Sequence, residues 1–293
     1  NDPKYFQGSR KPIPFKDHNP YVEAFWEWWP DLYPELKHFR MTGGEPMMDK
    51  NTYKVFDHVL ANPKPDLHLS TTSNFSVDEK LWTKYLGYVK DICSKDNVEH
   101  FMQYVSVDAF GDKAEYIRDG LDFDLLWERV NQFLTEVPER SSITFIITMN
   151  NLNVTSFGNL LAGINGLRHV YSNTYQRVWF DTPLLRTPEW QSMQLLPESY
   201  CDQLDLIWSW MLKWAETEET RFKGFKDYEM QRLDRDITWM RSGQKLDAKY
   251  LARQKADFYK FFTEHDKRRG TDFLKTFPEM KSFWKECEQY AKR

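Results

Sequence analysis

Residues 141–150 read SSITFIITMN, and this stretch decides the class of fold. It is rich in β-branched and apolar residues and holds no charged side chain, which is typical of a strand buried on both faces of a parallel sheet. The preceding residues 122–137 have helical spacing, with one apolar side formed by Leu126, Val130, Phe133 and Leu134. A helix that leads into a fully buried strand predicts an α/β protein.

The same alternation extends along the chain in both directions. Further strands are expected within residues 38–42, 66–74, 100–109 and 176–183, and further helices within 19–36, 50–60, 77–93 and 154–164. Repeated strand–helix units of this length predict parallel strands joined by right-handed crossovers. The residues alone leave open a doubly wound sheet and a complete or partial barrel.

Several residues are expected to set the ends of these helices. Pro30 and Pro34 should close the first helix, and Asp49 should cap the second. Ser76 and Glu79 have the spacing of a capping box for the third.

The pattern changes after Pro188, where only amphipathic helical segments follow. They lie within residues 196–219, 226–243, 246–270 and 279–293. We therefore expect an N-terminal loop over residues 1–20, a strand–helix domain over 21–187, and an all-helical region over 188–293. The helical region should pack against the sheet or over its open end.

Composition and charge exclude several classes of function. The chain has 293 residues and a net charge of −4, which argues against a dedicated nucleic-acid binder. It has no run of about 18 apolar residues, so no membrane span is expected. Its three cysteines, Cys93, Cys201 and Cys287, are too far apart for a disulfide framework and are expected to be buried apolar residues. The histidines lack zinc-site spacing, and a cytoplasmic location is expected.

Polar and glycine-rich segments follow the predicted strands. They are TGGEP at 42–46, TTSN at 71–74, SVDA at 106–109 followed by EYIR at 115–118, TMNNLN at 148–153, and FDTPLL at 180–185. Because parallel strands end at one edge of the sheet, where α/β proteins bind ligands, we expect these segments to converge on a small-molecule site. Gly43 and Gly44 lack a Cβ, so the backbone there can approach a ligand closely.

In this order, the segments resemble the radical S-adenosylmethionine superfamily. More narrowly, they are similar to the twitch domain-containing radical S-adenosylmethionine proteins of phages and marine bacteria. The shared features are GGEP, the S-x-D strand followed by EYIR, and the segment from Pro188 through Gln194 to Pro197. The resemblance covers residues 21–197. It implies a partial (β/α) TIM-like barrel of parallel strands with a C-terminal all-helical extension, and it implies S-adenosylmethionine and a 4Fe-4S cluster as cofactors.

The resemblance also implies roles for individual residues. Glu45 and the carbonyls around Gly43 and Gly44, in the turn closed by Pro46, would hold the amino group of the cofactor. Ser106 and Asp108 would lie near its ribose or carboxylate, and Arg118 would pair with the carboxylate. Asn74 and Asn150 are added because of their strand-end positions.

Ordinary structural roles remain open for the same residues. The GGEP segment can be a simple strand-to-helix turn, and Ser106 and Asp108 can be strand-end hydrogen-bonding groups. Glu115 and Arg118 have the spacing of a solvent-exposed helical ion pair.

The cysteines depart from the family pattern. In the family, a C-x-x-x-C-x-x-C segment upstream of GGEP holds the cluster, whereas here the first cysteine is Cys93. The chain starts at Asn1 and its first methionine is Met41, so we expect a truncated family member whose cluster segment lies upstream. Without that segment the chain alone is expected to be inactive.

Two alternatives remain open, and no motif specifies the substrate. The first is a degenerate barrel without a cluster that acts as a binding or interaction protein through its aromatic helical tail. The second is an unrelated α/β enzyme whose acid–base groups are Glu45, Asp108 and Asp181 on neighbouring strand ends, where two or three carboxylates would bind a divalent metal.

Overall fold

The structure is a computed structural model that describes residue 13 and residues 18–292. Most of the loop predicted over residues 1–20 therefore lies outside the described residues, and Pro20 already belongs to the first helix.

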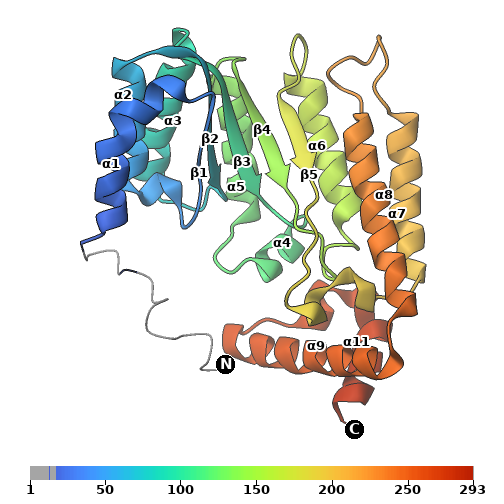
Figure 1. Ribbon diagram of the computed structural model, residues 1–293. Helices are drawn as coiled ribbons and strands as arrows, with labels where there is room; N and C mark the ends of the chain where they lie inside the picture. Colours follow the sequence, from blue (N-terminus) through green and yellow to red (C-terminus); the bar gives the residue numbers. More distant parts are fainter. Residues whose placement is uncertain (1–12, 14–17, 293) are drawn as a thin grey trace.

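Five parallel strands form one sheet in the order β1-β2-β3-β4-β5 (Figure 1). The strands are β1 (His38–Met41), β2 (Lys64–Ser73), β3 (Val98–Ser106), β4 (Ser141–Ile146) and β5 (Val178–Asp181). Each strand pairs with the next one in the sequence, and among the described residues β1 and β5 form the two edges. The predicted α/β class and the parallel pairing of all five predicted strands are thus confirmed.

Helices alternate with the strands and then replace them. They are α1 (Pro20–Leu32), α2 (Lys50–Ala61), α3 (Glu79–Ser94), α4 (Asp112–Ile117), α5 (Phe123–Glu136), α6 (Phe157–Tyr171), α7 (Ser199–Lys213), α8 (Asp227–Ser242), α9 (Ala248–Arg269), α10 (Phe273–Thr276) and α11 (Lys281–Ala291). Short 3₁₀ turns are η3 (Tyr33–Glu35), η4 (Pro46–Met48), η5 (Glu189–Gln191), η6 (Met193–Leu195), η7 (Gly243–Lys245) and η8 (Pro278–Met280). None of the described helices is long and apolar enough to cross a bilayer.

The α-helix α1 ends before Pro34, as predicted, but the predicted effect of Pro30 and the predicted start of α3 are wrong. Pro30 lies inside the final turn of α1. Because proline has no backbone N–H, the helix lacks only the hydrogen bond that residue 30 would donate to the Trp26 carbonyl. The buried side chains of Trp29 and Tyr33 hold this turn in place. The N-cap of α3 is Asp78, whose carboxylate accepts a hydrogen bond from the Leu81 amide at 2.8 Å. Ser76 and Glu79 therefore form no capping box, because aspartate directly before the helix is an equally good cap.

One face of the sheet is covered by helices and holds the main apolar core. In Figure 1, α5 and α6 lie behind the strands, and α3, α5 and α6 contact β3, β4 and β5. The strand within SSITFIITMN is buried over Ser141–Phe145, as predicted. The opposite face is polar and partly open: His38, Arg40 and His68 are exposed, and Ser70, Thr72 and Tyr104 are half-buried.

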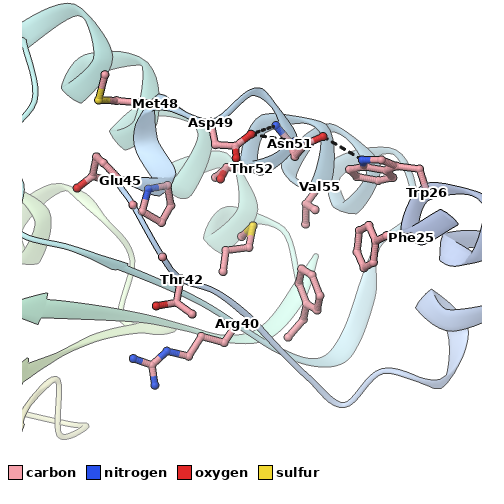
Figure 2. Close-up of a pocket in the computed structure, with 15 residues that line it drawn as sticks. Phe25, Trp26, Arg40, Thr42, Glu45, Met48, Asp49, Asn51, Thr52 and Val55 are labelled. Carbon is pink, nitrogen blue, oxygen red and sulfur yellow. Dashed lines mark hydrogen bonds between the residues drawn. The ribbon is translucent and has the colours of Figure 1, made fainter. Parts of the chain in front are cut away.

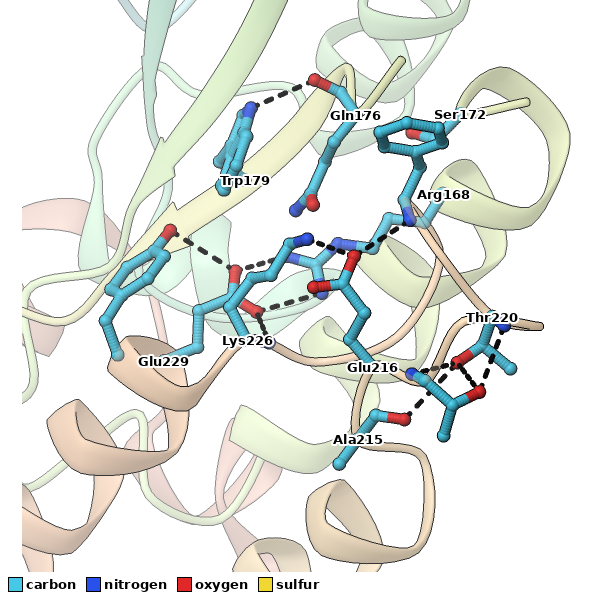
Figure 3. Close-up of polar contacts among 12 residues, drawn as sticks. Arg168, Ser172, Gln176, Trp179, Ala215, Glu216, Thr220, Lys226 and Glu229 are labelled. Atoms are coloured by element: carbon cyan, nitrogen blue, oxygen red, sulfur yellow. Dashed lines mark hydrogen bonds and ion pairs between the residues drawn. The ribbon is translucent and has the colours of Figure 1, made fainter. Parts of the chain in front are cut away.

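The C-terminal region is helical, as predicted, and packs against the strand–helix part of the chain in two places. Helices α7 and α8 stand beside β5, whereas α9 and α11 lie below the carboxyl ends of the strands (Figure 1). A fully buried ion pair between Arg168 of α6 and Glu229 of α8 fastens the first contact (Figure 3). Arg168 also donates to the Val178 carbonyl of β5 at 2.9 Å.

Candidate functional site

The TGGEP turn begins one residue after β1 ends. Gly43 and Gly44 have φ angles of 89° and 49°, which favour glycine. A Cβ built at either position would meet no atom within 4 Å, so the space beside this backbone is open. Glu45 then caps η4, where its Oε1 accepts a hydrogen bond from the Met47 amide at 3.0 Å. The turn thus places a carboxylate beside an open stretch of backbone.

The Glu45 carboxylate joins the ends of β1 and β2. Its Oε2 accepts a hydrogen bond from the Ser73 hydroxyl at 2.8 Å. Burial raises the pKa of Glu45, and hydrogen bonds from Met47, Ser73 and Asn74 partly counteract that rise. In its ionised form, this half-buried carboxylate can accept hydrogen bonds from a cationic group.

Most of the predicted site residues line one cavity, which we call the strand-end hollow. It has a volume of about 450 Å³ and lies at the carboxyl ends of β1, β2 and β3. Four parts of the chain form its wall. They are residues 42–45 and Met48, residues 72–74 and Ser76, Ser106, and residues 118–120. The structure therefore brings together Gly43, Gly44, Glu45, Asn74, Ser106 and Arg118, whose ligand roles remain predictions.

Asp108 and Arg118 form an ion pair at the border of this hollow. Arg118 Nε donates to Asp108 Oδ2 at 2.8 Å, and Asp108 Oδ1 accepts from the Thr148 amide at 2.8 Å. The Asp108 side chain is only 7% exposed, so it links β3 to the end of β4 rather than facing the strand-end hollow. Among the described residues, Arg118 Nη1 and Nη2 make no hydrogen bond.

The expected helical pair between Glu115 and Arg118 does not form. Arg118 is the C-cap of α4 and turns toward Asp108. Glu115 instead accepts a hydrogen bond from the Phe123 amide at 3.0 Å, which ties α4 to the start of α5. Arg118 is thereby positioned toward the strand ends.

A second cavity, which we call the helix-capped hollow, adjoins the first. Its volume is about 420 Å³, and Arg118 and Asp119 line both cavities. Asp108, Thr148 and Asn150 contribute from the ends of β3 and β4. The rest of the wall comes mainly from Leu185, Gln191 and the α9 residues Phe261, Phe262, His265 and Arg269.

The two predicted asparagines serve mainly to shape their loops. Asn150 Oδ1 accepts from the Leu152 amide at 2.8 Å and its Nδ2 donates to the Thr148 carbonyl at 2.9 Å. Asn150 lines the helix-capped hollow, not the strand-end hollow. Asn74 Oδ1 accepts from the Ser76 amide at 3.0 Å in an Asx turn.

A larger cavity, which we call the edge pocket, also borders the GGE turn (Figure 2). It has a volume of about 760 Å³ and opens along the free edge of β1. Phe25, Trp26 and Val55 form an apolar wall, and Asn51 accepts a hydrogen bond from Trp26 Nε1 at 2.9 Å. Pro46 also lines it, so the turn separates an apolar pocket from a polar hollow.

The carboxylates proposed as a metal site do not come together. Glu45 binds Ser73, Asp108 binds Arg118, and Asp181 pairs with Arg232 at 3.2 Å. In the part of the chain that the structure describes, no group of three or more His, Cys, Asp or Glu side chains could hold a metal ion. The structure therefore does not bring Glu45, Asp108 and Asp181 together as a three-carboxylate metal site.

The cysteines are buried and separate, as the sequence predicts. Cys93, Cys201 and Cys287 are free and at most 2% exposed. Burial raises the pKa of Cys93 to about 12 and also raises the pKa of Cys201 and of Cys287. Protonated, buried thiols on three different helices do not fit an iron–sulfur cluster.

No pattern in the sequence points to the α9 residues of the helix-capped hollow. Phe261, His265 and Arg269 follow the strand ends by more than 70 residues, and no local motif links them to the sheet. Gln191 lines the same hollow and belongs to the Pro188–Pro197 segment, so that segment is the sequence motif that comes closest to this contact.

Comparisons with known proteins add no family. No protein-family model matches the chain, and no curated protein matches it either.

Proposed function

We propose that the strand-end hollow binds S-adenosylmethionine and that the chain is the cofactor-binding part of a radical S-adenosylmethionine enzyme. The observation that carries the proposal is the convergence of TGGE, TTSN, Ser106 and Arg118 on one hollow. These are the segments on which the family resemblance rests, and they are far apart in the sequence. A volume of about 450 Å³ lies within the range of ordinary cofactor sites.

The charges that line the hollow are complementary to the amino-acid end of S-adenosylmethionine. Glu45 and the carbonyls of the glycine turn can accept hydrogen bonds from the ammonium group. Arg118, whose Nη groups have no partner among the described residues, can bind the carboxylate. Ser106 lies on the strand between them and would contact the ribose. When bound, S-adenosylmethionine supplies a reactive sulfonium group.

The open face of the sheet supports a partial barrel as the setting of this site. Parallel sheets are normally covered on both faces, yet the face with His38, Arg40 and His68 is polar and exposed. In a barrel this face would point inward. The sequential order of the strands also fits a barrel wall.

A cluster does not fit the cysteines of this sequence, so no electron-transfer step is assigned to its residues. We propose that the cluster ligands of the active enzyme come from a segment upstream of this sequence. The second candidate is a cluster-less binding protein, which the burial of all three thiols favours.

Calorimetry with S-adenosylmethionine tests the proposal. We expect binding by the wild-type chain, and we expect Ser106→Ala and Arg118→Gln each to weaken it by about tenfold. Arg140→Gln removes an arginine that pairs with Asp96 outside the hollow and should leave the affinity unchanged. Absence of binding by the folded wild type would refute the proposal.

A separate measurement distinguishes the two candidates. The DNA directly upstream should encode an in-frame C-x-x-x-C-x-x-C, and the extended protein should bind iron and sulfide after anaerobic reconstitution. Binding of S-adenosylmethionine without any upstream cysteine segment would instead identify the cluster-less binding protein.

A further inference from the structure

The helix-capped hollow is assembled from parts of the chain that are distant in sequence. Its floor is the end of β3 and β4, and its cover is α9. Arg269 Nη2 donates to Asp119 Oδ1 at 2.6 Å, and its Nη1 donates to the Tyr116 carbonyl at 3.1 Å. Tyr116 donates in turn to Asp266 Oδ1 at 2.8 Å. These contacts hold α9 in place over the strand ends, so the hollow is built into the fold.

Hydrogen-bond donors that the protein itself does not use line this hollow. Arg118 uses Nε for Asp108, while Nη1 and Nη2 have no partner among the described residues. The Thr148 hydroxyl and the Gln191 side-chain amide likewise have none there. Each Nη group carries two N–H donors, so Arg118 keeps donors for an anion beyond its bond to Asp108.

The charge balance limits how negative a ligand can be. Arg118 is paired with Asp108, and Arg269 is paired with Asp119. Because each cation already faces a carboxylate, a dianion would meet more repulsion here than a monoanion. A single carboxylate therefore suits the hollow better than a phosphate.

Aromatic side chains form the other side of the hollow. Phe261 is 43% exposed, and its ring centroid lies 4.1 Å from that of Trp190. Phe262 is buried behind it and also lines the hollow. An exposed ring at a cavity wall offers its face to a flat apolar group.

We propose that the helix-capped hollow binds the substrate and that this substrate is a small organic carboxylate with a planar apolar body. Its carboxylate is bound by Arg118, Thr148 and Gln191, and its ring packs against Phe261. The inference rests on the proposed function, because a reaction in the adjoining hollow is what makes the bound carboxylate a substrate.

A pair of matched probes tests the ligand class on the full chain. Indole-3-carboxylate and its neutral analogue indole-3-carboxamide have the same ring and differ in charge. By ligand-observed NMR titration, we expect a Kd of about 1 mM or less for the carboxylate and at least tenfold weaker binding of the carboxamide. Equal affinity of the two probes, or no binding of the carboxylate, would overturn the proposal.

Variants on one helix locate the probe. Phe261→Ala should weaken carboxylate binding about fivefold or more. Tyr250→Ala is the matched control, because Tyr250 is 37% exposed on the same helix but does not line the hollow. Equal affinities of these two variants would contradict the assignment of Phe261.

Ser106→Ala separates this inference from the proposed function. Ser106 lines only the strand-end hollow, so the variant should lose affinity for S-adenosylmethionine and keep its affinity for indole-3-carboxylate. Carboxylate binding that depends on Phe261, in a chain that does not bind S-adenosylmethionine, supports the site and refutes the proposed function. If the chain binds S-adenosylmethionine but its binding of indole-3-carboxylate does not depend on Phe261, the substrate site is refuted and the proposed function stands.

Discussion

At the scale of single residues, two carboxyl groups stand out because burial raises their pKa. Glu45 lies at the wall of the strand-end hollow, whereas Asp236 of α8 is fully buried. A carboxyl group whose pKa is raised on folding stabilises the protein at low pH, and that contribution is lost as the pH rises through the folded-state pKa. Both groups therefore make the folded state less stable at neutral pH, and only Glu45 faces a cavity that can bind a ligand.

Glu45→Gln tests this interpretation of the turn. The variant removes the charge that would bind an ammonium group, so we expect affinity for S-adenosylmethionine to fall by about tenfold. The amide does not carry the desolvation cost of the carboxylate, so the free energy of unfolding should not decrease. Calorimetry and urea unfolding measure the two effects, and a loss of stability with unchanged affinity would contradict the assignment.

The pH dependence of binding should follow from the same group. Because the pKa of Glu45 is raised, the carboxylate becomes protonated at a higher pH than an ordinary glutamate does. Affinity of the wild type for S-adenosylmethionine should fall as the pH is lowered through this value. In Glu45→Gln this part of the pH dependence should be absent, which calorimetry between pH 4.5 and 8 would measure.

Asp236 allows a prediction about stability alone. Burial raises the pKa of Asp236 to about 6, and its Oδ2 has no hydrogen-bond partner among the described residues. The wild type should therefore lose stability relative to Asp236→Asn as the pH rises from 4 to 7, by about 1–3 kcal/mol. Urea unfolding at several pH values checks this. A constant difference between the two proteins would show that Asp236 does not titrate in this range.

At the scale of elements, the attachment of α8 to α6 and β5 depends on a buried ion pair. Arg168 and Glu229 are both fully buried, and Arg168 Nη1 donates to Glu229 Oε2 at 3.0 Å. Glu229 also accepts from the Lys226 amide at 3.0 Å, so the same carboxylate caps α8 (Figure 3). One side chain thus determines both where the helix begins and where it docks.

Removal of one partner should be costly. Glu229→Gln leaves a buried guanidinium without its counter-charge, and we expect a loss of about 3–5 kcal/mol in the free energy of unfolding. The control is Asp205→Asn, which breaks the exposed ion pair between Asp205 of α7 and Arg241 of α8 and should cost less than about 1 kcal/mol. Similar costs for the two variants would show that the buried pair does not fasten α8.

Elements could be predicted from the sequence where their signal is local. SSITFIITMN and the other strands have apolar runs, and the helices have one apolar side, so the sheet and its parallel pairing follow from pattern alone. The first helix ends before Pro34 as predicted, but Pro30 does not end it, because packing of Trp29 and Tyr33 outweighs the local effect of that proline. The strand-end residues could be found because every parallel strand ends at the same edge. Phe261 and Arg269 could not be found, since their contact with this edge depends on how α9 packs.

At the scale of the whole molecule, two cavities share one wall but belong to different parts of the chain. The strand-end hollow is formed by residues before position 121, whereas the helix-capped hollow needs α9. Arg118 and Asp119 lie between them. A ligand in one hollow should therefore stabilise a different set of segments from a ligand in the other.

Hydrogen exchange followed by mass spectrometry can measure this division. S-adenosylmethionine should slow exchange in residues 42–48, 72–76 and 118–120, and indole-3-carboxylate should slow it in residues 258–270. Peptides of α7 serve as the internal control, because α7 lines neither hollow. The same protection pattern with both ligands would mean that the cavities are not separate sites.

The free edge of β1 also affects how the purified protein behaves. On the side of β1 that faces away from β2, the backbone N–H and C=O groups have no neighbouring strand among the described residues. The edge pocket lies alongside them. Edge strands that are short and carry charged or polar side chains resist edge-to-edge association between molecules, and β1 has only four residues, with His38 and Arg40 exposed. Purified protein should therefore remain clear on concentration, and Arg40→Val, which removes the charge from this edge, should lower the protein concentration at which light scattering begins.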